Sequence, residues 1–134
     1  MAAVIDTSIW VDLFHPKTPP GARTAARLAV EREDAVLCEP VCLEFLRGVP
    51  ASHYSAVRDF LESVPILPTP PVLWAEALRL ARECYRGGHP VSSMDTLIAG
   101  VCVLHRAELV TFDQGFEPLA KIGGFRLVVL ERRT

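Results

Sequence analysis

The sequence predicts an α/β fold for residues 1–134: one domain with a mainly parallel sheet of four or five strands, covered by helices on both faces. Three observations lead to this fold class. Short apolar runs alternate with segments in which apolar residues recur at helical spacing. The runs are apolar at nearly every position, which is typical of strands buried on both faces of a parallel sheet. Half of the residues are hydrophobic, and a chain of this length can bury a substantial core.

The first half of the chain contains three predicted strands and three predicted helices. The strands are the apolar runs at residues 2–5, 35–38 and 64–67. A helix is expected to begin near Ser8, and a second spans residues 21–32 after a proline-rich turn at 16–20. Pro40 suits the first turn of a third helix, which ends at Gly48.

The second half continues the alternation, with strands predicted at residues 108–111 and 126–130. A fourth helix begins at residue 69 and ends at Gly87-Gly88, and it is predicted by the helical spacing of Trp74, Ala77, Leu78, Ala81 and Tyr85. A fifth helix is predicted by the spacing of Leu97, Ile98, Val101 and Cys102.

The composition bears on the possible partners, the state of the cysteines and the location of the protein. The formal net charge of −2 neither predicts nor excludes a nucleic-acid partner. The four cysteines have no CxxC spacing, so we expect buried reduced thiols and neither zinc ligands nor disulfides. The N-terminus lacks the features of a signal peptide, and the longest apolar stretch, residues 97–104, is too short to cross a bilayer. We therefore expect a soluble, cytoplasmic protein without a membrane partner.

Four acidic residues are predicted to meet at one edge of the sheet. Asp6 follows the first strand and Asp113 follows the fourth, so both belong at the carboxyl edge, where ligands bind in parallel sheets. Asp95 lies near the start of a helix and Glu44 about one turn into another, and helices that follow parallel strands begin at this same edge. Thr111 lies two residues before Asp113, so its hydroxyl is expected on the same side of the strand.

Each acidic residue also has a purely structural explanation. The structural alternatives are a helix cap at Asp6, a capping box formed by Ser92 and Asp95, a surface ion pair between Glu44 and Arg47, and an Asx turn at Asp113. Convergence of all four residues weakens these alternatives, because two carboxylates about 4 Å apart repel each other by roughly 4 kcal/mol at an effective dielectric constant near 20. A cation relieves this repulsion, and oxygen ligands without His or Cys favour Mg²⁺ or Mn²⁺.

Four segments, VIDTSIWVD, LEFLRG, SMDTLIAG and LVTFDQGF, occur in this order. Together they resemble the PIN-domain ribonucleases, and most closely the VapC-type toxins of type II toxin–antitoxin pairs, over essentially the whole chain. The resemblance implies a three-layer α/β/α sandwich. It also implies Mg²⁺- or Mn²⁺-dependent cleavage of single-stranded or structured RNA. The partners it implies are a second copy in a homodimer, a VapB-like antitoxin, and DNA only indirectly through that antitoxin.

The family's acidic quartet falls on Asp6, Glu44, Asp95 and Asp113, which the resemblance makes both catalytic and metal-binding. Asp6 and Asp95 are expected to bind the ion directly, and Asp113 either directly or through water. Glu44 is expected to position a water molecule or a second ion.

Two hydroxyls complete the catalytic set that the resemblance implies. Thr7 matches the small polar residue after the first acid, and Thr111 matches the hydroxyl of a T-x-D motif. Gly115-Phe116 departs from the acidic residue plus Phe that commonly follows the last acid in the family. This departure puts only the turn in doubt, and Phe116 is expected in the core.

Several other residues carry weaker expectations. Arg82, Arg86 and His89 precede Asp95 and are candidates for RNA phosphate contacts, although a solvated helix face is the simpler explanation. The apolar residues Trp10, Leu13 and Phe14 are expected in the core, with an antitoxin-binding groove or a dimer contact as the alternative. His15, His53 and His105 show no metal-ligand spacing.

Other function classes fit the sequence less well than the ribonuclease. A haloacid-dehalogenase-like phosphatase needs a second Asp two positions after the first, where this chain has Ser8. A receiver-like phospho-acceptor needs a well-placed Lys, and only Lys17 and Lys121 are present. Within the resembled family, a housekeeping RNA-processing nuclease and a nuclease-silent partner in a DNA-bound antitoxin complex remain alternatives.

Overall fold

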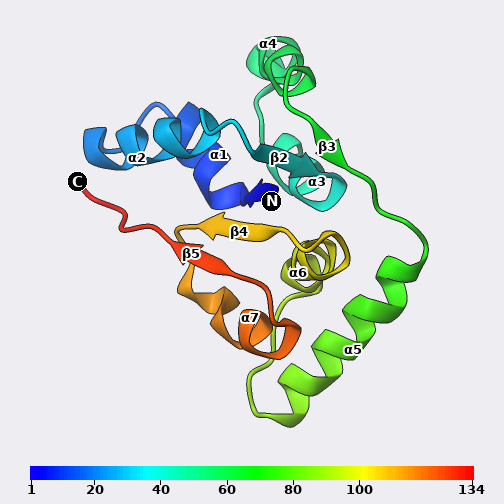
Figure 1. The fold of residues 1–134 in the computed structure, drawn as a ribbon. Helices are drawn as coiled ribbons and strands as arrows, with labels where there is room; N and C mark the ends of the chain where they lie inside the picture. Colours follow the sequence, from blue (N-terminus) through cyan, green and yellow to red (C-terminus); the bar gives the residue numbers. More distant parts are fainter.

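Five short strands form one parallel sheet in the computed structural model, which describes residues 1–134 (Figure 1). The strands are β1 (Ala3–Ile5), β2 (Ala35–Cys38), β3 (Ile66–Leu67), β4 (Glu108–Thr111) and β5 (Leu127–Val129). Their spatial order is β3-β2-β1-β4-β5, and every neighbouring pair is parallel. The predicted parallel sheet is therefore confirmed, although β3 and β5 at its edges are shorter than the apolar runs suggested.

Seven α-helices connect and cover the strands. They are α1 (Thr7–Phe14), α2 (Pro20–Val30), α3 (Glu39–Leu46), α4 (Ala51–Glu62), α5 (Val72–Arg86), α6 (Ser93–His105) and α7 (Glu117–Gly123), with a short 3₁₀ turn η1 (Gln114–Phe116) before α7. The five predicted helices correspond to α1, α2, α3, α5 and α6. The sequence did not predict α4 or α7, and α4 buries only Val57 and Leu61, which is too few for a clear apolar period.

The helices form the two outer layers of the predicted α/β/α sandwich. The chain moves across the sheet in one direction from β1 to β3 and then returns to form β4 and β5. Because parallel crossovers are right-handed, this reversal places α1–α4 on one face and α5–α7 on the other. Figure 1 shows α1 and α2 on the opposite side of the sheet from α6 and α7, and α5 packs on the outside of α6 and α7.

The reversal leaves β1 and β4 as neighbours, although about a hundred residues separate them along the chain. Val4 lies opposite Leu109 and Ile5 opposite Val110, and all four are buried. Asp6, which follows β1, and Thr111, the last residue of β4, are thereby placed side by side. This is the topological switch point at which doubly wound folds bind ligands.

The core consists of the strands and the inward faces of the helices that cover them. Trp10 and Phe116 are its largest fully buried side chains, and the burial of Phe116 confirms its predicted role. The indole Nε1 of Trp10 donates a hydrogen bond of 3.1 Å to the carbonyl oxygen of Ile5. All four cysteines are free, and Cys38, Cys84 and Cys102 are buried. No helix combines the length and the apolar character needed to cross a membrane.

Candidate active site

Asp6 links the end of β1 to the start of α1. Its backbone N–H donates to the carbonyl oxygen of Val110 on β4 at 2.9 Å, which continues the ladder between the two strands. Its side chain is only 3% exposed and caps α1 by accepting from the backbone N–H of Ser8. The helix-cap explanation is therefore correct for Asp6. It does not exclude a second role, because a carboxylate has two oxygens and several lone pairs.

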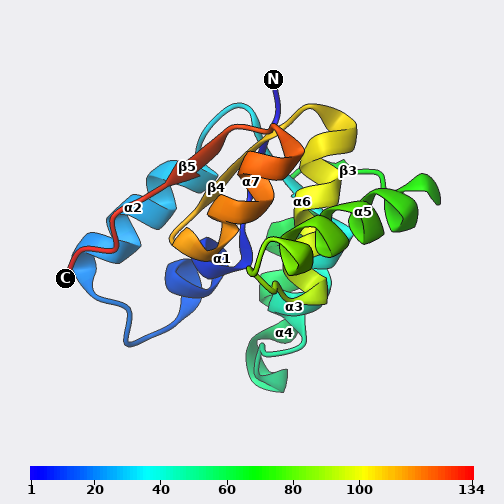
Figure 2. The ribbon, with the colours of Figure 1, turned by 90° about the horizontal axis from the view of Figure 1, so that it is seen from below.

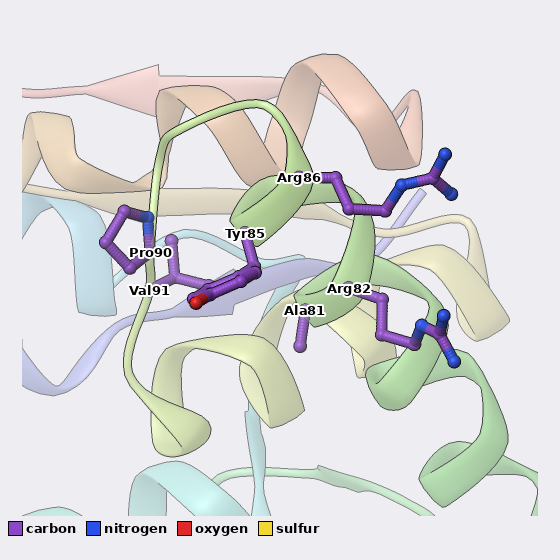
Figure 3. A pocket seen from close by; sticks show the side chains of 6 residues that line it. All are labelled: Ala81, Arg82, Tyr85, Arg86, Pro90 and Val91. Carbon is purple, nitrogen blue, oxygen red and sulfur yellow. The ribbon is translucent and has the colours of Figure 1, made fainter.

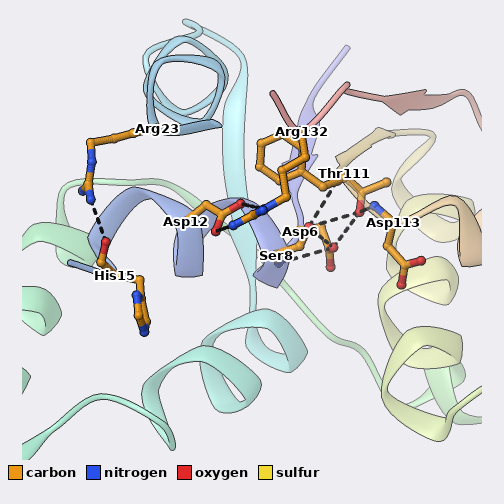
Figure 4. Close-up of polar contacts among 9 residues, drawn as sticks. Asp6, Ser8, Asp12, His15, Arg23, Thr111, Asp113 and Arg132 are labelled. Carbon is orange, nitrogen blue, oxygen red and sulfur yellow. Dashed lines mark hydrogen bonds and ion pairs between the residues drawn. The ribbon is translucent and has the colours of Figure 1, made fainter. Parts of the chain in front are cut away.

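Two hydroxyls hold the carboxylate of Asp6 in place (Figure 4). Its Oδ2 accepts from Thr111 Oγ1 at 2.7 Å and from Ser8 Oγ at 2.8 Å. Burial raises the pKa of Asp6 above its usual 3.8, and the hydrogen bonds from Thr111 and Ser8 oppose that rise. The sequence did not single out Ser8 as a site residue. The available signal was its place two residues after a helix-capping Asp.

Asp113 lies just beyond the end of β4 and belongs to the same network. Its backbone N–H donates to Thr111 Oγ1 at 2.9 Å. Its Oδ1 accepts from the backbone N–H of Gly115 at 2.7 Å, so the predicted Asx turn is present. Figure 4 shows the carboxylates of Asp113 and Asp6 on the same side of the sheet edge. Asp113 is exposed, whereas Asp6 and Thr111 are buried.

Glu44 approaches the site from α3, which follows β2. Its Oε1 accepts a short hydrogen bond from the hydroxyl of Thr7, the first residue of α1. The alternative ion pair between Glu44 and Arg47 is not formed, because Glu44 turns toward α1 and away from the next turn of its own helix. The contact places Thr7 between Glu44 and the neighbouring Asp6, and so brings a third acid to the carboxyl edge.

Asp95 lies in the first turn of α6, and the charges of the other three acids affect the pKa of its carboxyl group. Its backbone N–H donates to Ser92 Oγ at 3.1 Å, so Ser92 is the predicted helix cap. The pKa of the Asp95 carboxyl rises from 3.8 to about 6, first because of burial and then because of the negative charge of Asp6. Glu44 and Asp113 raise the pKa further, while the Ser92 hydroxyl lowers it. Asp95 therefore lies within electrostatic range of each of the other three predicted acids.

The donor chemistry of this cluster fits a hard divalent cation. It consists of carboxylates and hydroxyls, with neither His nor Cys among the donors. No three His, Cys, Asp or Glu side chains lie close enough together to bind one ion directly. Mg²⁺ keeps several of its waters and binds through one or two carboxylates, so the wider spacing suits an ion held partly through water.

The remaining candidates lie outside this cluster. His15, His53 and His105 make contacts with neighbouring backbone or hydroxyl groups. Trp10 is buried in the core as expected, whereas Phe14 is 36% exposed. Asp12, a buried acid one turn after Ser8, forms an ion pair of 2.7 Å with Arg132 (Figure 4).

Comparisons with known proteins identify the family of this chain. A family model described as "PIN domain" matches residues 3–122. The VapC ribonuclease Mb1587 of Mycobacterium bovis is 29% identical over 123 residues, which cover 89% of this chain and 92% of the relative. Ribonuclease VapC11 of Mycobacterium tuberculosis has the same identity and coverage.

Solved structures share the fold over nearly the whole chain. VapBC2 from Rickettsia felis, bound to a DNA fragment from its promoter, matches with a TM-score of 0.77 and 19% identity over 98% of this chain and 100% of that one. DNA-bound VapBC from Salmonella typhimurium matches with a TM-score of 0.72 and 20% identity over 95% and 96% of the two chains. The match over residues 3–122 and the four acids at the carboxyl edge have one explanation: this chain belongs to the PIN-domain family.

Proposed function

We propose that this protein is a divalent-metal-dependent endoribonuclease that acts as the toxin of a toxin–antitoxin pair. The observation that carries the proposal is the convergence of Asp6, Glu44 and Asp113 on Asp95, whose pKa rises to about 6 through burial first and then through these neighbouring charges. A folded protein keeps such mutually repelling charges where a cation or the reaction requires them. The names of the VapC relatives favour the toxin over a housekeeping nuclease.

Asp6 and Asp95 would hold the ion, Mg²⁺ or Mn²⁺, and Asp113 would bind it through water, because no three of these side chains lie close enough to bind one ion directly. When bound, the ion supplies Lewis acidity and offsets the charge that builds on a phosphodiester during hydrolysis. Ser8 and Thr111 fix the orientation of the Asp6 carboxylate through their hydrogen bonds. Thr7 orients Glu44, which we assign to positioning the attacking water, or a second ion.

The proposed partners are RNA as substrate, a VapB-like antitoxin and a second copy of the chain. Solved relatives are VapBC complexes, two of them bound to DNA, and we infer that DNA reaches this protein only through its antitoxin. An aromatic cluster on α1, α3 and α4 offers an apolar surface for the antitoxin. Phe14 stacks on Phe45 with centroids 5.8 Å apart and meets Phe60 edge-on at 5.5 Å, and both Phe14 and Phe60 are partly exposed.

The test is incubation of the purified protein with total RNA in Mg²⁺, in Mn²⁺ and in EDTA, followed by mapping of the cut ends. Cleavage is expected with either metal ion and not in EDTA. Asp95→Asn is the matched inactive variant, because it keeps the size of the side chain and removes its charge. Wild-type protein that leaves RNA intact with both ions, or a variant that cuts as fast as wild type, would contradict the proposal.

A further inference from the structure

A cavity of about 460 Å³ lies at the C-terminal end of α5 (Figure 3). It is formed by the end of α5 and the loop that leads into α6, and is lined by Ala81, Arg82, Tyr85, Arg86, Pro90 and Val91. The loop continues directly into Ser92, whose hydroxyl caps α6 at Asp95. The last lining residue, Val91, is therefore followed directly by the residue that caps α6 at Asp95.

The charge of the cavity is positive and uncompensated. α5 carries three arginines, and Arg79 is paired with both Glu76 and Glu83. Arg82 and Arg86 make no ion pair and no hydrogen bond, and both are exposed. They are four residues apart on one helix, and Figure 3 shows their guanidinium groups extending in the same direction. Two free guanidinium groups so placed suit a chain of phosphates.

The cavity also presents an aromatic surface. Tyr85 is 76% exposed, although a tyrosine ring gains much by burial. Figure 3 shows its ring beside Pro90 and Val91, which support it on the loop side. Exposed aromatic rings combined with arginines are the features by which proteins bind single-stranded nucleic acid, through base stacking and phosphate contacts.

We propose that this cavity binds a nucleotide of the RNA substrate next to the segment that is cut. A base stacks on Tyr85, and Arg82 and Arg86 bind the adjoining phosphates. This inference rests on the proposed ribonuclease function and deepens it, because it assigns residues that contact the RNA strand.

A second copy of the chain is the competing occupant, since Trp74 and Leu78 are also exposed on α5. The unpaired guanidinium groups of Arg82 and Arg86 complement the phosphates of RNA, and this charge complementarity favours RNA over a second copy.

The binding test measures fluorescence anisotropy of a short fluorescein-labelled single-stranded RNA, with every protein carrying Asp95→Asn so that the RNA stays intact. Tyr85→Ala is expected to weaken binding about ten-fold or more without changing its salt dependence. Arg82→Gln and Arg86→Gln are each expected to reduce the slope of log affinity against log salt concentration by about 0.7. Arg58→Gln is the matched control, because Arg58 is exposed on α4 and is also free of ion pairs.

The outcomes separate this inference from the ribonuclease proposal. The same substitutions are also made in the protein that keeps Asp95, where cleavage is measured. If the wild type cuts RNA, and the three cavity variants bind RNA in the Asp95→Asn background and cut it in the wild-type background like Arg58→Gln, the inference is wrong and the ribonuclease stands. If the wild type cuts nothing but binds RNA through Tyr85 and the arginines, the inference holds and the ribonuclease does not. Loss of dimers for Tyr85→Ala in sedimentation, with RNA affinity unchanged in the arginine variants, would assign the face to a second copy and overturn the inference.

Discussion

Asp6 shows how one residue serves both the fold and the proposed chemistry. Its carboxylate caps α1 and accepts hydrogen bonds from Ser8 and Thr111, all at the end of a fully buried strand. Burial would favour the neutral acid, and the hydrogen bonds favour the carboxylate. Burial is the larger of the two effects and leaves the pKa of Asp6 above 3.8, while the hydrogen bonds hold the carboxylate oxygens in a fixed orientation.

Asp95 is expected to make the stability of the metal-free protein depend on pH. Its pKa is about 6 in the folded protein, above the ordinary 3.8, so the folded state binds this proton more tightly than the unfolded chain. The contribution of Asp95 to stability therefore falls as the pH rises from about 4 to about 6. In EDTA, the melting temperature of Asp95→Asn minus that of the wild type should be larger at about pH 7 than at about pH 4.

The control for this comparison is Asp59→Asn, which alters an exposed acid on α4 outside the acidic cluster and should not reproduce the effect of Asp95→Asn. A melting temperature for Asp95→Asn below that of the wild type at neutral pH would mean that the carboxylate mainly stabilises the start of α6. That result would count against repulsion within the cluster.

Metal binding is expected to stabilise the wild type by mass action. An ion present at a hundred times its dissociation constant adds about 2.7 kcal/mol to the free energy of unfolding. Asp6→Asn keeps a side chain that can cap α1 but removes the charge, so Mg²⁺ or Mn²⁺ should raise its melting temperature much less. Calorimetry with and without the ion measures both shifts, and equal shifts in the two proteins would show that Asp6 is not a ligand.

At the scale of the element, α5 illustrates the limit of periodicity. The spacing of Trp74, Leu78 and Tyr85 predicts the helix correctly, but these three side chains are 69%, 60% and 76% exposed. The buried face instead carries Leu73, Ala77, Leu80 and Cys84. The helix therefore carries two stripes of apolar residues, each with the helical repeat. Only packing against α6 and α7 decides which stripe is buried.

The ends of α6 and α7 provide a matched test of backbone strain. Arg106 ends α6 with a φ of 51°, and Gly124 ends α7 with a φ of 74°, so both adopt the left-handed conformation. Arg106→Gly should stabilise the protein and Gly124→Ala should destabilise it, each by about 0.5–1 kcal/mol. A Cβ at Gly124 would meet no atom within 4 Å, so its effect comes from the backbone alone.

Urea denaturation of both variants measures these two changes. Opposite signs confirm that the left-handed caps limit the stability of these helix ends. The same sign for both variants would contradict this account.

At the scale of the whole molecule, the C-terminal segment connects the last strand back to the first helix. Figure 2 shows the C-terminus beside α2, and a Cβ on Gly21 would lie 2.6 Å from the carbonyl oxygen of Thr134. Within this segment Arg132 pairs with Asp12, whose side chain is buried. The pair joins residues 120 positions apart in sequence.

Arg132→Gln is therefore expected to lower the melting temperature by several degrees, because it leaves the buried carboxylate of Asp12 without its partner. Arg133→Gln is the matched control. Its partner Glu131 is largely exposed, and exposed pairs add little to stability. Equal melting temperatures for the two variants would mean that the tail does not hold α1.

The sequence by itself determined the order of the elements and the chemistry at their ends. The strands read as unbroken apolar runs because both faces of a parallel sheet are buried, and the acids Asp6 and Asp113 mark the point where two of these runs end. Since parallel strands share one carboxyl edge, the same pattern predicted that the acids would converge. The helices α4 and α7 were missed because local pattern is weak where few side chains are buried.

Only the tertiary structure decided which distant residues touch. The neighbouring positions of β1 and β4 bring Ser8 against Thr111, and the packing of α3 beside α1 brings Thr7 against Glu44. Packing likewise left Tyr85 and two arginines of α5 facing solvent beside the loop to Asp95. The physical reason is that periodicity and propensity act over one or two turns of chain, whereas these contacts depend on how whole elements pack against each other.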